Sequence, residues 1–171
     1  GKNRDGKSQD GRSADGDSCD DDGSSDDDSD DHGSKDRDKR MTGGGSVFTT
    51  GKDRVTHGME LHCDATALPN NLEVNWGKGE KFHLDALSSV VCSDDPRIGP
   101  AKPVASFDTM VGLGTGSYNG RSGATVAFTF TDAGEPGRSD TATINIKDAG
   151  GRIVLTVSGS VSNGNQQAHG R

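Results

Sequence analysis

The chain has 171 residues, a formal net charge of −8 at neutral pH and only 4% aromatic residues. No basic stripe with interleaved aromatic residues is present, which excludes the usual nucleic-acid-binding surfaces, and no apolar run has the length of a membrane span. The acidic excess is concentrated in one part, because residues 1–40 carry 8 Lys/Arg and 14 Asp while residues 41–171 carry 11 Lys/Arg and 13 Asp/Glu. We therefore divide the chain into an acidic tail, 1–40, and a nearly neutral domain, 41–171.

The tail repeats a short aspartate-glycine-serine unit. From Asp5 the sequence is DGKSQ, DGRSA, DGDSC and then DDDGSSDDDSDD. Before Met41 only Ala14 and Cys19 are even weakly apolar. The side chains of such a segment bury too little surface to offset its chain entropy. We therefore expect the tail to be extended and non-globular.

The density of aspartates in the tail points to cation binding. Between Asp10 and Asp31 eleven aspartates stand against one base, Arg12. Carboxylates about 6 Å apart repel by roughly 0.7 kcal/mol per pair even in water, so a fixed conformation needs counter-charge. Calcium is suited to this, because it takes about six to eight oxygen ligands in flexible geometry. The predicted calcium ligands of the tail are Asp5, Asp10, Asp15, Asp17, Asp20, Asp22, Asp26, Asp28 and Asp30. The alternative is a solvated acidic linker, which this composition commonly forms.

Apolar residues alternate with polar ones along most of residues 41–171, which predicts β-strands. No stretch of ten residues has a helical period. We expect an all-β domain, an antiparallel, jelly-roll-like β-sandwich of about eight to ten short strands. Ile153, Leu155 and Val157 are expected to face the core together. The alternating segments are 59–63, 72–76, 82–84, 124–131, 142–146 and 153–157.

Three cysteines are present, Cys19, Cys63 and Cys92. A Cys63–Cys92 bridge closes a loop of about 30 residues and stabilises the domain by roughly 3.5 kcal/mol in the chain-entropy model. The alternative is two buried free thiols. Cys19 then remains odd, either free or cross-linked to another chain. A disulfide favours an oxidising, extracellular setting.

Four short pieces of the domain occur in a characteristic order. They are GGG at 43–45, FHL at 82–84, DAGEPG at 132–137 followed by Asp140, and GNQQAH at 164–169. In this order they resemble the bacterial "post-choice-of-anchor" type of secreted β-domain, over nearly all of residues 42–170. The resemblance implies an extracellular, non-catalytic module of surface proteins. The acidic repeats in front resemble thrombospondin type-three calcium repeats, without their full run or their paired cysteines.

The DAGEPG region is a second calcium candidate. Asp132, Glu135 and Asp140 surround a Gly- and Pro-containing loop whose carbonyl groups provide further oxygen ligands. The alternative is a tight connection in which Asp132 and Asp140 accept hydrogen bonds from backbone amides.

Three histidines, His57, His62 and His83, are expected on the polar side of their strands. A zinc site among them is the alternative to solvated side chains.

No catalytic arrangement is evident, because no serine has the strand-turn-helix setting of a nucleophile elbow, and outside the Phe core only Trp76 and Tyr118 offer a ring to a sugar. We predict a secreted structural protein rather than an enzyme. It would be a subunit of a surface filament or layer, with the calcium-ordered tail linking identical neighbours. The predicted assembly residues are Cys19, Val47 and Phe48, since any strand exchange begins after about residue 41. The alternative is a calcium-dependent adhesion or carbohydrate-binding module with a surface glycan as partner.

Overall fold

The computed structural model describes residues 38–99 and 103–170. Within these ranges the chain forms nine β-strands and no helix, which confirms the expected all-β, antiparallel class. The strands are β1 (Arg40–Phe48), β2 (Arg54–His62), β3 (Asn71–Trp76), β4 (Glu80–Ser93), β5 (Thr109–Tyr118), β6 (Arg121–Thr131), β7 (Thr141–Lys147), β8 (Ile153–Ser160) and β9 (Ser162–His169). In the described ranges no helix has the length and apolar character that crossing a lipid bilayer requires. The predicted tail ligands from Asp5 to Asp30, and Cys19, lie outside the described residues.

All nine strands belong to one sheet, in the order β8-β7-β6-β5-β4-β3-β2-β1-β9. From β1 to β8 each strand pairs antiparallel with the next along the chain, as in a meander, and β9 returns to pair with β1. The turn at 148–151 joins β7 to β8, as the glycine-rich sequence there predicts. Consecutive strands β8 and β9 therefore lie at the two open ends of the sheet, which is nearly closed on itself.

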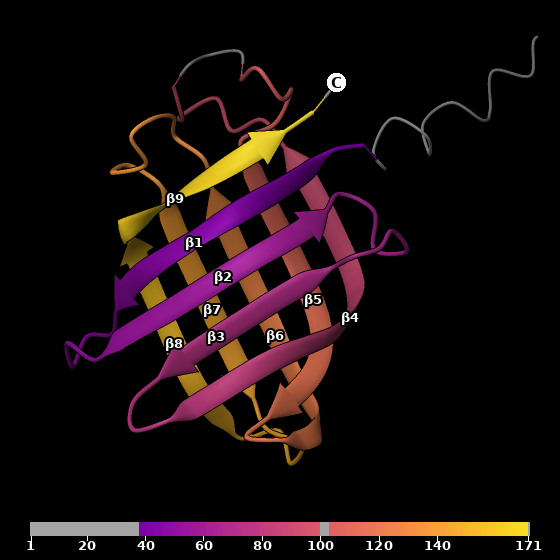
Figure 1. Ribbon diagram of the computed structural model, residues 1–171, viewed down its shortest axis with the longest axis vertical. Helices are drawn as coiled ribbons and strands as arrows, with labels where there is room; N and C mark the ends of the chain where they lie inside the picture. The colour runs from indigo at the N-terminus through magenta and orange to yellow at the C-terminus, as the bar shows by residue number, and fades with distance from the viewer. Residues whose placement is uncertain (1–37, 100–102, 171) are drawn as a thin grey trace, which may run out of the picture.

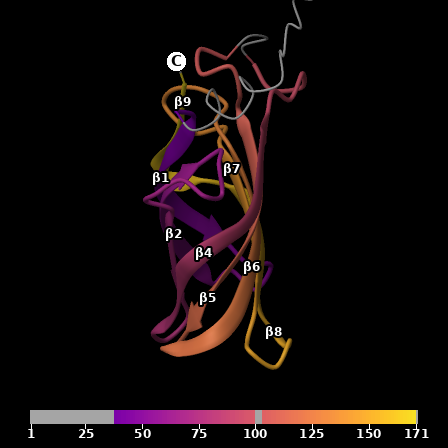
Figure 2. The same cartoon turned by 90° about the vertical axis from the view of Figure 1, so that its right-hand side faces the viewer.

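The sheet folds into two packed layers. Strands β9, β1, β2 and β3 cross in front of β5, β6, β7 and β8 in Figure 1, and the edge-on view in Figure 2 separates the two layers. The long strand β4 belongs to both, and its pairing with β5 shifts register between Leu84 and Ala86 and between Leu87 and Ser89. Such bulges bend a strand, so they allow β4 to pass from one layer to the other.

The core lies between the layers and follows the alternation of the sequence. Phe128 and Phe130 on β6 stack with ring centroids 4.9 Å apart. The expectation for Ile153 is wrong, because this side chain is 64% exposed. A register shift against β7 places Leu155 opposite Ile146 but Ile153 opposite Lys147, so the alternation breaks between Ile153 and Leu155.

Cys63 and Cys92 form the expected disulfide, with their Cα atoms 5.7 Å apart. Cys63 directly follows β2 in the front layer, whereas Cys92 lies near the end of β4, where β4 pairs with β5 of the other layer. The bridge therefore fastens the two layers to each other at one end of the fold.

Candidate functional site: the seam between β9 and the β6–β7 loop

Strand β1 carries the glycine triplet 43–45 between its two partners β2 and β9. A Cβ atom added at Gly44 would overlap the carbonyl oxygen of His57, and one added at Gly43 would overlap that of Asn165. Both carbonyl oxygens belong to the backbone of paired strands, so they cannot move aside as a flexible side chain can. The triplet therefore keeps this part of β1 free of side chains where β2 and β9 pack closest to it.

Beside the glycines, His57 of β2 meets Gln166 of β9 in the interior. Both side chains are buried, and His57 Nε2 lies 3.0 Å from Gln166 Oε1. The Gln166 amide nitrogen donates to the carbonyl oxygens of Thr131, at 2.7 Å, and Thr141, at 2.9 Å. Because that nitrogen is the donor, Oε1 is the acceptor, and His57 must donate from Nε2. One side chain thus joins β9 to β2, β6 and β7.

The His57 ring is held in its neutral form. It stacks on Phe130 with ring centroids 5.3 Å apart, and its Nδ1 atom is buried without a hydrogen-bond partner. Burial lowers the pKa of His57, and the hydrogen bond to Gln166 only partly opposes this effect. A proton on Nδ1 would place a charge among apolar side chains without a counter-ion.

The loop between β6 and β7 closes the free edge of β9. Asp140 accepts a hydrogen bond at Oδ2 from the backbone N–H of Gln166, and Asp132 accepts one at Oδ2 from that of Ala168, each at 2.8 Å. In a sheet these N–H groups would pair with a further strand, and an unpaired edge invites association with another chain. Two carboxylates stand in for the missing strand.

The remaining oxygens of the same carboxylates hold the loop itself. Asp132 Oδ1 accepts from the Gly134 amide at 2.9 Å, and Asp140 Oδ1 accepts from the Ala133 amide at 2.8 Å. Burial raises the pKa of Asp140 above its ordinary value, although hydrogen bonds from Gln166 and Ala133 oppose this. This geometry matches the turn-and-cap alternative drawn from the sequence.

Glu135 ties the outer side of the loop to β9. Its Oε1 atom accepts from Gln167 Nε2 at 2.5 Å and from Asn165 Nδ2 at 2.8 Å. These two hydrogen bonds lower the pKa of Glu135, that from Gln167 more strongly. Calcium binding by Asp132, Glu135 and Asp140 stays a prediction; the described ranges contain no group of three or more His, Cys, Asp or Glu placed to hold a metal ion.

We call this set of interacting side chains the seam cluster: His57, Asp132, Glu135, Asp140 and Gln166. It joins the DAGEPG loop to the GNQQAH strand, which pairs in turn with the glycine triplet of β1. The sequence identified the carboxylates, but it offered His57 only as part of a zinc alternative and Gln166 only as part of the GNQQAH piece.

The placement of His57 on the polar side of β2 is wrong, whereas His62 has the opposite parity, lies on that side and is covered by the segment that follows the strand. Only 6% of the His57 surface and 9% of the His62 surface is exposed. His57 shares its strand parity with Met59 and Leu61, and this signal alone predicts an inward side chain. His62 is held at Nδ1 by the Pro69 carbonyl oxygen, 2.8 Å away.

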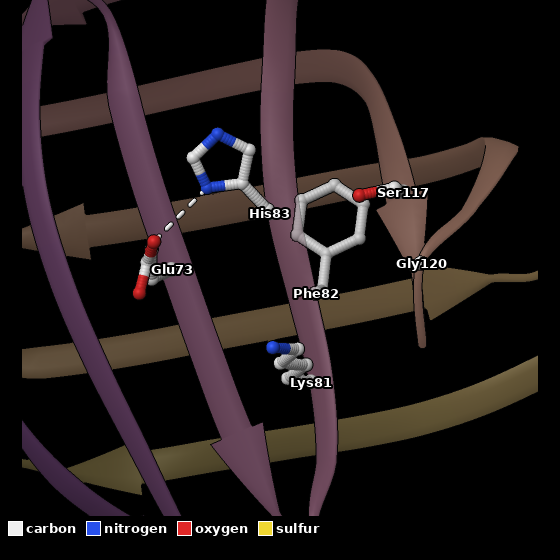
Figure 3. Close-up of a pocket in the computed structure, with 6 residues that line it drawn as sticks. All are labelled: Glu73, Lys81, Phe82, His83, Ser117 and Gly120. Carbon is white, nitrogen blue, oxygen red and sulfur yellow. Dashed lines mark hydrogen bonds and ion pairs between the residues drawn. The ribbon is translucent and has the colours of Figure 1, made fainter.

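The fourth piece, FHL at 82–84, lies outside the seam cluster. Figure 3 shows a hollow around it, in which His83 of β4 points towards Glu73 of β3, with Nδ1 and Oε1 3.0 Å apart. Both of these side chains are more than half exposed. Phe82 instead belongs to the core, with 1% of its surface exposed. A hydrogen-bonded histidine and carboxylate therefore line the hollow.

The two rings considered for sugar stacking contact each other. Trp76 and Tyr118 stack with centroids 5.7 Å apart, and Trp76 is only 7% exposed. The Tyr118 hydroxyl donates to Glu80 Oε1 at 2.7 Å, and this hydrogen bond raises the pKa of Tyr118. Trp76 thus offers little free ring surface to a ligand.

The two described residues predicted to act in assembly lie in different settings. Val47 is fully buried in the core of its own domain, whereas Phe48 is 48% exposed at the end of β1. Because β1 pairs on both sides, with β2 and with β9, strand exchange here would have to break two ladders.

No protein-family model matches the chain, and no curated protein and no solved structure matches it either.

Proposed function

We propose that the protein is an extracellular, non-catalytic structural protein, a subunit of a surface filament or layer. The observation that carries this proposal is what the carboxylates of the seam cluster bind. A catalytic site aims its acid, base or nucleophile at a space that a substrate occupies. Here the four carboxylate oxygens of Asp132 and Asp140 accept hydrogen bonds from backbone amides instead. These two carboxylates are thereby committed to holding the loop against β9.

The seam cluster also supports the proposed relation to secreted β-domains. The resemblance rests on four pieces. The loop carboxylates join the DAGEPG region to the GNQQAH strand, and the glycine triplet pairs with that strand through the β1–β9 ladder. Residues that interlock in this way constrain one another, so they are suited to mark a family. The Cys63–Cys92 disulfide adds support for an extracellular setting, because disulfides persist mainly in oxidising compartments.

The proposed link between subunits is the acidic tail, ordered by calcium. Its aspartates lie outside the described residues, so this part of the proposal rests on their spacing and charge. Calcium bridging would neutralise the local repulsion and provide contacts that the tail cannot make with apolar side chains.

The test compares the full chain in calcium with the same chain in a chelator. Sedimentation velocity should show large assemblies in millimolar calcium and their loss on chelation. Replacing Asp20, Asp22 and Asp26 together by Asn should mimic the chelator, because ligand charge falls while shape is unchanged.

A matched control carries the same charge change within the tail, at aspartates outside the predicted ligand set, Asp21, Asp27 and Asp31. This triple Asn variant should keep most of the calcium-dependent assembly. A full chain that sediments as a monomer in calcium would contradict the proposal.

One observation favours a second candidate, a carbohydrate-binding module. A surface hollow beside Tyr118 is lined by polar side chains, including Arg121, Asp148 and Arg152. An aromatic ring among convergent polar groups is a common composition for a saccharide site. Binding of soluble glycans that disappears in Tyr118→Ala, with the fold intact, would favour this candidate over a purely structural role.

A further inference from the structure

The layer formed by the second half of β4 and by β5 to β8 has an outer face with almost no charge. The register of these strands arranges its outward side chains in four rows of five. One row is Val91, Val111, Thr129, Thr143 and Ser158, and the next is Ser89, Leu113, Ala127, Asn145 and Thr156. The two flanking rows are Ser93, Thr109, Thr131, Thr141 and Ser160, and Ala86, Thr115, Thr125, Lys147 and Ile153. We call these positions the uncharged face; Lys147, near one corner, is its single charged side chain.

The outer face of the opposite layer has a different composition. Its register rows place Glu73 opposite His83 and Asn75 opposite Lys81, and Glu60 stands opposite Asn71. Charged side chains of both signs therefore cover that layer, as is usual for a surface facing water. Both layers bury an apolar inner side in the same core. Folding alone therefore does not require the uncharged face to lack charged side chains.

Several hydroxyl groups of the uncharged face are already paired within it. Thr131 Oγ1 and Thr141 Oγ1 are 2.7 Å apart, as are Thr143 Oγ1 and Ser158 Oγ. A hydroxyl that keeps its hydrogen bond loses little when water is removed, whereas an unpaired one costs up to a few kcal/mol. These rows are therefore prepared for contact with another surface.

Exposed apolar side chains lie on the same face. The exposed fractions are 63% for Val91, 45% for Val111, 51% for Leu113 and 64% for Ile153. Val91 and Val111 are cross-strand neighbours, and Leu113 follows on the outward side of β5. At one border stands the ion pair of Asp95 and Arg97, 2.7 Å apart, beside Ile98. An apolar patch with charged residues beside it is common in protein interfaces, which have an apolar core and a polar rim.

We propose that the uncharged face is a contact surface on which a second copy of this chain packs, sheet against sheet. Strands about 4.8 Å apart, with outward residues about 6.7 Å apart along each strand, give the five-by-four grid about 600 Å². Two such faces bury about 1,200 Å² in total, the lower limit for a specific, stable interface. This area reaches the low end of what a dimer needs.

The chemistry of the face favours a second copy over other occupants. With Lys147 as its only charge, the face offers a single cation to an acidic peptide or to phosphate groups, too few to favour such a partner. Its best complement is another sheet that is uncharged and interdigitates at about 10 Å, and the same face on a second subunit fits this description. A two-fold axis near its centre sets Val111 and Leu113 against their copies and leaves Lys147 towards the border.

This inference rests on the proposed assembly of identical subunits, but its test is separate from calcium. Sedimentation equilibrium of the full chain in a chelator, over a wide concentration range, removes the calcium-dependent contacts of the tail. The wild type should show a reversible dimer. Leu113→Lys should raise the dissociation constant at least tenfold, because it buries an unpaired charge within the contact.

A matched control adds the same charge to the other layer. Asn71→Lys lies on β3 opposite Glu60, and it should dimerise like the wild type. Thr143→Lys, on β7, is a second face variant in case Leu113→Lys fails to fold. On dilution of the wild type, amide chemical shifts should change along β5 to β8 and stay constant along β2 and β3.

A wild type that stays monomeric in chelator at the highest concentration overturns the inference, and so does equal dimerisation of wild type and both face variants. A monomer retained on an insoluble polysaccharide through this face would make a glycan its partner and also overturn the inference. In each of these cases, calcium-dependent assembly through the tail would leave the proposed function standing.

Discussion

The seam cluster and the uncharged face differ in where they place charged and polar groups. The seam cluster buries an amide, an imidazole and the Asp140 carboxylate, and gives nearly every polar atom a hydrogen-bond partner within the chain. The uncharged face presents hydroxyl, methyl and branched aliphatic groups to the outside, with one charge at its corner. Charge is thus used where the sheet closes on itself and is nearly absent where the sheet is open to a partner.

The contrast teaches that the two regions answer to different requirements. Side chains of the seam cluster decide whether β9 stays joined to β6 and β7, so changes there should alter the free energy of unfolding. Side chains of the uncharged face contact little besides one another, so changes there should alter association and leave stability within about 0.5 kcal/mol.

The largest effect on stability is expected from the disulfide. Replacing Cys63 and Cys92 together by Ser should lower the free energy of unfolding by roughly 3.5 kcal/mol, because the loop they close is released in the unfolded chain. Urea denaturation measures the loss. Dimer formation through the uncharged face should persist wherever the variant is folded, and its loss in the folded variant would break the separation between the regions.

The glycine triplet provides a matched pair on directly opposed residues of β1 and β2. Gly44→Ala should cost about 3 kcal/mol, because the added methyl group overlaps backbone atoms of β2 that cannot move away. Gly58, its register partner, has open space at the same position. Gly58→Ala should therefore stabilise the domain by about 0.5 kcal/mol through lower entropy of the unfolded chain. Thermal or urea unfolding of both variants gives the comparison, and equal effects would contradict the close packing at β1.

Gln166→Leu tests the link across the seam. The substitution keeps most of the volume but leaves the Thr131 and Thr141 carbonyls and His57 without their partner, so we expect a loss of about 2 to 3 kcal/mol. Gln167→Leu is the control, because this neighbouring side chain is exposed and makes only the hydrogen bond to Glu135. It should cost less than about 1 kcal/mol. Similar losses from both would show that Gln166 is not the central residue of the seam.

The smallest effect concerns pH. Because burial holds the pKa of His57 below its ordinary value, the unfolded chain takes up a proton as the pH falls through about 6.5 while the folded chain does not. Stability should therefore be full above this pH and fall below it, by at most about 1.4 kcal/mol per pH unit from this group. The raised pKa of Asp140 acts with the opposite sign and at more acidic pH.

His57→Gln should remove that part of the slope, whereas His83→Gln, at an exposed position, should keep it. Urea unfolding at several pH values between about 5 and 7 measures the slope for each variant. A slope that survives in His57→Gln would assign the pH dependence to another group.

The fold class and most of the core were predictable because both follow from short-range alternation. The strands that carry Phe128, Ile144 and Val74 point the side chains inward as their parity requires. The exposure of Ile153 was not predictable, because one extra residue in β8 reverses the inward-outward alternation there and no residue in the sequence marks this bulge.

The seam cluster was only partly predictable, for a different reason. Turn chemistry identified Asp132 and Asp140 as caps of their own loop, since those contacts are local. Their hydrogen bonds to β9 span 36 and 26 residues of sequence. Such contacts depend on β9 returning to β1, which alternation along a single strand does not reveal.

Electron microscopy of the full chain, in calcium and in a chelator, tests the central claim most directly. The account predicts filaments or layers in calcium, built from repeated β-domains, and their dissolution into small particles of one or two subunits on chelation. Particles of a single subunit under both conditions, at concentrations where the protein is abundant, would contradict a structural role in assembly.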